Sequence, residues 1–131
     1  MKTIIIVENG NVEQESISDI LSQHTENYEL LLTDAELASI YIAQQANVDL
    51  IIYDLSSAQS EQLDNLDRVT NLFPYIPCIA VIDEERGAQS PEVHTGISLC
   101  LSRPLKTAEL QQQISEQLNL ATSGQVRGIP I

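Results

Sequence analysis

Five short apolar segments alternate along the chain with stretches in which apolar residues recur every three or four positions. The segments are rich in β-branched residues, which is typical of strands buried on both faces of a parallel sheet. Strands that alternate with helices over short loops form right-handed βαβ units. The pattern therefore predicts an α/β fold, a doubly wound five-stranded parallel sheet, without giving the strand order. The predicted strands cover residues 4–7, 28–32, 48–55, 78–82 and 99–101.

Helical spacing fills the intervals between these strands. Asn11 is expected to be the N-cap of the first helix. Thr33 and Glu36 fit a capping box at the start of the second helix, and Ser90-Pro91 fits the start of a weakly patterned fourth one. The apolar residues expected to face the sheet are Ile17, Ile20 and Leu21 in the first helix, Leu37, Ile40 and Tyr41 in the second, Leu63, Leu66, Val69 and Phe73 in the third, and Leu110, Ile114 and Leu118 in the last.

Length and charge bound the domain organisation and the partners. With 131 residues, of which 43% are hydrophobic, the chain is long enough for one domain with its own core. We assign residues 1–120 to that domain. Residues 121–131 are assigned to a linker, whose apolar end fits equally the start of a following output domain. The net charge of −13 argues against binding of nucleic acid or of an anionic membrane by this domain.

The cysteines and the apolar segments bear on the compartment. Cys78 and Cys100 each lie inside an apolar stretch, which favours small buried hydrophobic residues over a disulfide or a metal site. No stretch of the sequence has the pattern of a signal peptide or the length of a membrane span. We therefore expect a cytoplasmic protein.

Asp54 closes the third and most continuous apolar segment, which begins at Val48. A carboxylate in that position lies at the carboxyl edge of the sheet, where open α/β sheets bind their ligands. Burying an aspartate costs free energy unless another group pairs with it. Asp54 is therefore either a functional acid or an acid with a structural partner.

The spacing of the polar residues at the strand ends resembles that of the receiver domain of two-component response regulators. Glu8 follows the first strand, Asp54 ends the third, and Arg103-Pro104 follows the fifth. The segment from Gly96 to Leu105 is similar to the family's strand-five signature, and the resemblance covers about residues 2–120. It implies the flavodoxin-like (βα)5 receiver fold.

The resemblance also implies a site. Asp54 falls on the position that accepts a phosphoryl group from a histidine kinase in this family. Mg²⁺ would be held by Glu8, Asn9, Asp54 and the backbone carbonyl of Ser56. A divalent cation screens the charge that develops during phosphoryl transfer, and it prefers oxygen ligands.

Several positions depart from the family pattern. Asn9 replaces a metal-binding aspartate, so Mg²⁺ binding is expected to be weak or absent. Ile82 stands at the family's switch position, which carries Ser or Thr, and isoleucine has no hydroxyl to bond to a phosphoryl oxygen. Cys100 replaces an aromatic residue. Arg103 replaces a lysine, and its planar fork suits a constitutive bond to the carboxylate of Asp54 or of Glu8.

The resemblance leaves two functions open. The first is phosphorelay at Asp54. The second is a degenerate receiver that keeps the fold as a protein-protein interaction module, and the departures from the family pattern favour this second function. Neither is an enzyme. The expected partner is a histidine kinase or another signalling protein. A homodimer is expected to use the helix after Ser90, the strand at 99–101 and the last helix. A flavodoxin-like domain that binds a small molecule is the alternative, although the loop after the first strand has a single glycine, Gly10, and no phosphate-binding pattern.

Overall fold

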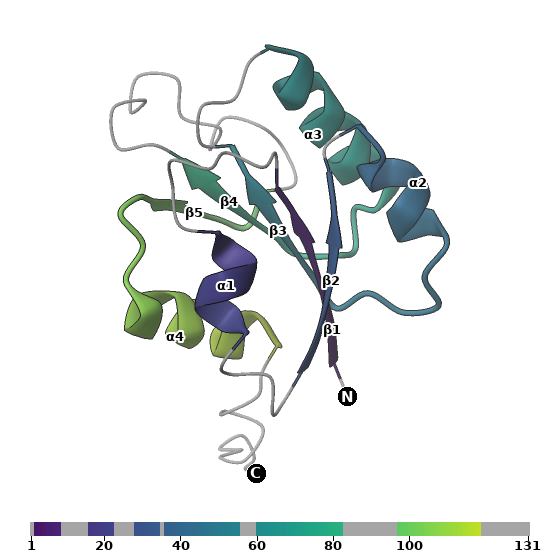
Figure 1. Cartoon of the computed structure of the whole chain (residues 1–131). Coiled ribbons are helices and arrows are strands. Elements are labelled where there is room, and N and C mark those ends of the chain that lie inside the picture. Colours follow the sequence, from purple (N-terminus) through teal and green to yellow (C-terminus); the bar gives the residue numbers. More distant parts are fainter. Residues whose placement is uncertain are drawn as a thin grey trace, which may run out of the picture.

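The computed structural model describes residues 2–8, 16–22, 28–34, 36–55, 60–82 and 97–118. Strands and helices alternate through most of this part of the chain (Figure 1). In chain order the elements are β1 (Lys2–Val7), α1 (Ile17–Leu21), β2 (Tyr28–Thr33), α2 (Ala38–Ala43), β3 (Leu50–Asp54), α3 (Ser60–Leu72), β4 (Cys78–Ile82), β5 (Leu99–Ser102) and α4 (Thr107–Leu118).

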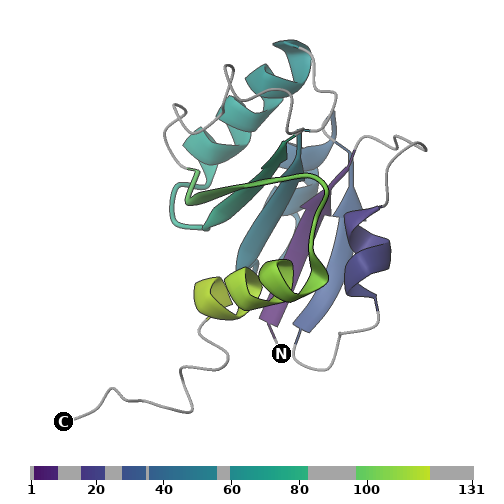
Figure 2. The ribbon, with the colours of Figure 1, turned by 90° about the vertical axis from the view of Figure 1, so that its left-hand side faces the viewer.

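The strands form one parallel sheet in the order β2-β1-β3-β4-β5. Strand β1 lies between β2 and β3, so the chain crosses over β1 after β2 to reach β3, the central strand. Helices α1 and α4 cover one face, and α2 and α3 cover the other (Figures 1 and 2). The prediction of a doubly wound five-stranded parallel sheet is confirmed.

The core consists of two apolar layers separated by the sheet. Side chains of a strand alternate between its faces, so Ile4 and Ile6 of β1 join the layer under α1 and α4, whereas Ile5 and Val7 join the layer under α2 and α3. All residues of β3 and β4 are buried, as the continuous apolar segments predicted. The faces predicted for the first and last helices are buried as well: Ile17, Ile20, Leu21, Leu110, Ile114 and Leu118.

Two predicted helix starts lie partly or wholly outside the described residues. The N-cap position of α1 is held by Ser16, later than the expected Asn11, which the structure does not describe. The helix expected after Ser90-Pro91 falls within residues 83–96, also outside the described part. In α3, Leu66 and Val69 are buried and Phe73 packs against their layer, as predicted.

The orientation predicted for α2 is wrong. Ala38 and Ile42 are its buried residues, whereas the side chains of Leu37 and Ile40 are 52% and 59% exposed. Position 40 is two residues from Ala38, which places it on the opposite side of a helix, since successive residues turn by about 100°. Tyr41 lies between these directions and is partly buried.

The start of α2 also differs from the expected capping box. The backbone N–H of Leu37 donates to Oδ1 of Asp34 at 2.9 Å, and Leu37 itself holds the N-cap position without a side-chain cap. The carboxylate of Asp34 therefore takes the place expected for the pair Thr33 and Glu36. The helix then begins at Ala38, and the small side chain of this alanine faces the sheet.

The cysteines behave as buried or half-buried apolar residues, as expected. Neither cysteine is in a disulfide; Cys78 is buried in β4 and Cys100 is half-buried in β5. Burial, with a smaller contribution from Cys100, raises the pKa of the Cys78 thiol to about 12. Cys78 is therefore a neutral thiol at physiological pH.

Two buried tyrosines differ in their hydrogen bonding. The hydroxyl of Tyr28 donates to Oε1 of Gln111 on α4 at 3.2 Å. The hydroxyl of Tyr53 has no hydrogen-bond partner within the described part of the chain. Burial raises the pKa of both phenols; Cys78 and Asp34 raise that of Tyr53 further, whereas the hydrogen bond to Gln111 lowers that of Tyr28.

The substitution Tyr53→Phe is expected to raise the free energy of unfolding by about 1 kcal/mol, because it removes a buried hydroxyl that accepts and donates no hydrogen bond among the described residues. Tyr28→Phe is the matched control. It removes a hydroxyl that has a partner, and it is expected to lower the free energy of unfolding by about 1 kcal/mol. Urea unfolding at pH 7 measures both. Losses of equal size would contradict the difference between the two hydroxyls.

Within the residues that the structure describes, none of the helices has the length and apolar character needed to cross a membrane.

Candidate functional site

The candidate site lies at the carboxyl edge of the sheet, where β3, β4 and β5 end side by side. Asp54 is the last residue of β3 and pairs with Val81 of β4. Ile82, the last residue of β4, pairs with Ser102 of β5. The next residue, Arg103, donates its backbone N–H to the carbonyl of Ile82 at 2.8 Å. This pairing fixes where the Arg103 side chain leaves the sheet.

Arg103 forms a buried ion pair with Asp54. Nη2 of Arg103 donates to Oδ2 of Asp54 at 3.1 Å, and the side chains are 10% and 6% exposed. A charge-assisted hydrogen bond of this kind is stronger than a neutral one. Of the two pairs expected from the sequence, Arg103 with Asp54 or with Glu8, the structure contains the first. The buried acid therefore has a partner on its own chain.

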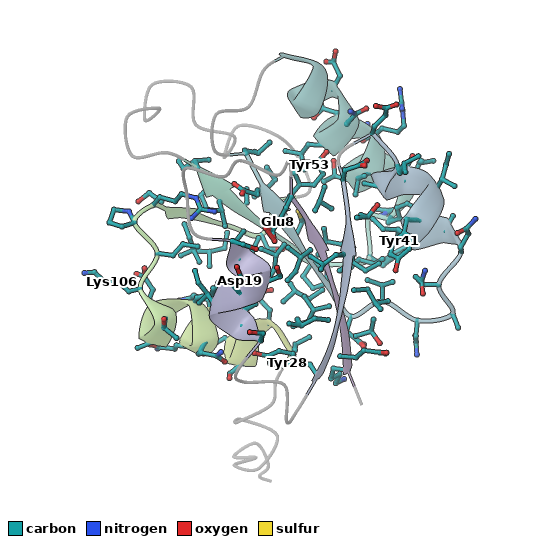
Figure 3. All side chains as sticks on the ribbon, in the orientation of Figure 1. Glu8, Asp19, Tyr28, Tyr41, Tyr53 and Lys106 are labelled. Carbon is teal, nitrogen blue, oxygen red and sulfur yellow. The ribbon has the colours of Figure 1, made fainter. Side chains whose placement is uncertain are left out.

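Glu8, the acidic residue after β1, contacts the start of α1. The hydroxyl of Ser16 lies 2.9 Å from Oε1 and 2.7 Å from Oε2 of Glu8, and the backbone N–H of Ser18 donates to Oε1 at 3.2 Å. The hydroxyls of Ser16 and Ser18 are 2.7 Å apart. Figure 3 shows Glu8 above α1. A carboxylate at the first turn satisfies N–H groups that the helix cannot pair and favours its dipole.

The sequence reasoning missed this role of Glu8. Its signal was the serine at position 16, directly before the apolar residues of α1, because serine is a preferred N-cap residue. The hydroxyl of Ser16 bonds to Glu8, and no side-chain cap bond from Ser16 to the helix is formed. Glu8 thus acts as the capping group from a neighbouring strand end.

The two described carboxylates at this edge, those of Asp54 and Glu8, each accept hydrogen bonds from donors of their own chain. Of the ligands implied by the resemblance, Asn9 and Ser56 lie outside the described residues. The carboxylate of Asp54 is engaged by Arg103, and that of Glu8 by Ser16 and Ser18. Among the described residues, His, Cys, Asp and Glu side chains form no group of three that could hold a metal ion. A cation would have to compete with these contacts.

Ile82 and Cys100 contribute apolar contacts at this edge. Ile82 is buried and belongs to the layer under α2 and α3, which Cys100 packs against. Tyr53 of β3 pairs with Ala80 of β4, and Ala80 pairs with Cys100 of β5. Of these three paired residues, the aromatic one is therefore on β3, and the small ones are on β4 and β5. Asp83, the residue after Ile82, lies outside the described part of the chain.

Comparisons with known proteins give no sequence relative but clear structural ones. No protein-family model and none of the curated proteins matches the sequence. The signal receiver domain of an HD domain-containing protein from Pseudomonas fluorescens is 23% identical, with a TM-score of 0.69 over 96% of this chain and 93% of that one. A response regulator receiver domain protein from Clostridium thermocellum is 16% identical, with a TM-score of 0.72 over 91% and 95% of the two chains.

A third similar structure carries a different name. A putative pilus assembly protein from Burkholderia thailandensis is 15% identical, with a TM-score of 0.73 over 91% of this chain and 99% of that one. At these identities the likeness concerns the arrangement of the backbone. The strand order, the all-parallel sheet and the near-complete coverage agree with the flavodoxin-like (βα)5 architecture that the sequence predicted. The chain therefore has the fold of the receiver domains of response regulators.

Proposed function

We propose that this chain is a receiver domain that acts as a protein-protein interaction module, with phosphorylation at Asp54 impaired or absent. The buried ion pair between Arg103 and Asp54 is the observation that carries the proposal. It gives the acid at the end of β3 a structural role that needs no phosphoryl group.

Phosphoryl transfer to a carboxylate depends on three conditions. A cation screens the developing charge, donors bind the phosphoryl oxygens, and the carboxylate must be accessible to attack. Here Arg103 and an incoming cation compete for Asp54, and Ile82 supplies no hydroxyl where the resemblance places a donor. Asp54 is also only 6% exposed. Each of these features opposes the transfer.

The expected partner is a histidine kinase or another signalling protein, and Mg²⁺ is expected to bind weakly or not at all. The homodimer surface proposed from the sequence comprises β5, α4 and the helix expected after Ser90. The structure describes β5 and α4 of this surface, and the third part lies outside the described residues. The surface stays a proposal.

Incubation with Mg²⁺ and acetyl phosphate, followed by intact-mass measurement, tests the proposal. We expect no stoichiometric phosphoryl adduct on the wild-type chain. A conventional receiver in the same reaction confirms that the donor is active. Asp54→Asn identifies adducts formed on other residues, because it removes the acceptor carboxylate while keeping the size of the side chain. A stoichiometric adduct that Asp54→Asn abolishes would overturn the proposal.

A further inference from the structure

The outer side of α2 exposes apolar side chains that the fold does not use. Leu37 and Ile40 point away from the layer that Ala38 and Ile42 enter. Asp34 and Glu36, both exposed, immediately precede the helix. We call Leu37 and Ile40, with Asp34 and Glu36, the α2 patch.

The charged residues in the stretch of sequence that contains the α2 patch are all negative. From residue 25 to residue 67 the chain contains no Lys, Arg or His, and the next basic residue is the exposed Arg68 of α3. Glu29, Asp34, Glu36 and Asp64 are exposed residues of this stretch. The acidic residues in it are Glu26, Glu29, Asp34, Glu36, Asp49, Asp54, Glu61, Asp64 and Asp67. The α2 patch is therefore an apolar centre with acidic residues beside it.

Charge complementarity decides what fits such a surface. Nucleic acid and anionic membranes would be repelled. A second copy of this chain meeting the patch through a two-fold axis would place the same acids against each other. A helix that presents apolar residues at spacings of three and four, with Lys or Arg on either side, matches both the centre and the charge.

We propose that the α2 patch is a docking site for a basic amphipathic helix of a partner protein. The proposal rests on the proposed function of an interaction module, and it names the surface and the chemistry of the partner. Leu37 and Ile40 are one helical turn apart and Tyr41, labelled on α2 in Figure 3, follows directly. Together they would contact the apolar face of the partner, and Asp34 and Glu36 its basic residues.

The chain offers a matched control surface at the end of α3. Leu72 is 58% exposed, close to the value for Ile40, and Tyr75 beyond it is 94% exposed. Between residues 69 and 82 the sequence contains no Asp or Glu. The sequence that carries this second apolar surface therefore has no acidic residues, and we expect the surface not to select a basic partner.

The test uses a synthetic helical peptide of about five turns, with leucines along one face and lysines beside them, and the whole wild-type chain. Amide chemical shifts are expected to change at residues 34–44, and calorimetry is expected to show binding that weakens as salt is added. The same peptide with glutamates in place of the lysines is expected not to bind. Shift changes confined to another surface would overturn the proposal.

Single substitutions separate the α2 patch from other exposed residues. Ile40→Ser and Glu36→Lys are each expected to weaken peptide binding about tenfold, equivalent to about 1.4 kcal/mol. Leu72→Ser, with the same chemistry at a similar exposure, is expected to change it less than about twofold. Equal weakening by Ile40→Ser and Leu72→Ser would contradict the docking site.

The two proposals fail in different experiments. An Asp54-dependent phosphoryl adduct overturns the proposed function without moving the peptide-binding site. A peptide that leaves the amides of α2 unchanged overturns the docking site whatever the phosphodonor gives.

Discussion

Replacing Arg103 with methionine is expected to lower the free energy of unfolding by about 3 kcal/mol, because removing one partner of a buried ion pair leaves the other charge uncompensated. Methionine keeps an unbranched apolar stem, so the loss reports the guanidinium group more than the packing of the chain. Urea unfolding followed by circular dichroism gives the difference.

Two controls define the origin of this loss. Arg68→Met removes an exposed arginine from α3 and is expected to change the free energy of unfolding by less than about 0.5 kcal/mol. The double substitution of Arg103 by methionine and Asp54 by leucine removes both charges, and it is expected to restore most of the stability. If Arg103→Met cost no more than Arg68→Met, the ion pair would not explain why Asp54 is buried.

The strands were predictable because their burial leaves a local signal. A segment such as residues 50–53 is apolar at every position because both faces of the strand are covered. The order of the strands has no such signal. It depends on which strands meet across the sheet, and β1 lies between β2 and β3 because the chain crosses over it after β2.

The orientation of α2 was not predictable from its apolar residues. Their spacing fits a buried face at Leu37, Ile40 and Tyr41, yet the helix turns Ala38 and Ile42 to the sheet. With six residues, α2 has too few positions for periodicity to decide between these faces. The choice of face is made by the tertiary structure, and Leu37 and Ile40 remain at the surface.

The site was predictable in part. The position of Asp54 at a strand end followed from the apolar segment before it, whereas the sequence left the partner of Arg103 open between Asp54 and Glu8, and the structure contains the pair with Asp54. The contact between Glu8 and Ser16 was not predictable, because it depends on how the end of β1 meets the start of α1, and the resemblance implies a metal ligand at Glu8. Both acids accept hydrogen bonds from donors of their own chain.

Restoring the family's residues at three positions is expected to create an acceptor. The triple substitution Asn9→Asp, Ile82→Thr and Arg103→Lys should raise the initial rate of phosphorylation by acetyl phosphate at least about tenfold, equivalent to lowering the barrier by about 1.4 kcal/mol. Aspartate adds a charged oxygen ligand for Mg²⁺. Threonine adds a hydroxyl donor, and lysine replaces the fork of Arg103 by a single ammonium group. Intact-mass measurement with and without Mg²⁺ reads the result.

Valine in place of threonine at position 82 tests the hydroxyl separately. Valine and threonine have the same shape, so the triple variant with Ile82→Val matches the first variant in packing and lacks only the donor. We expect it to be phosphorylated less than the threonine variant, since one bond to the phosphoryl oxygens is missing. Adding Asp54→Asn is expected to abolish the adduct. The triple variant could also remain folded and as unreactive as the wild type. In that case residues 9, 82 and 103 would not be what keeps Asp54 from accepting a phosphoryl group. The burial of Asp54 itself would then be the cause.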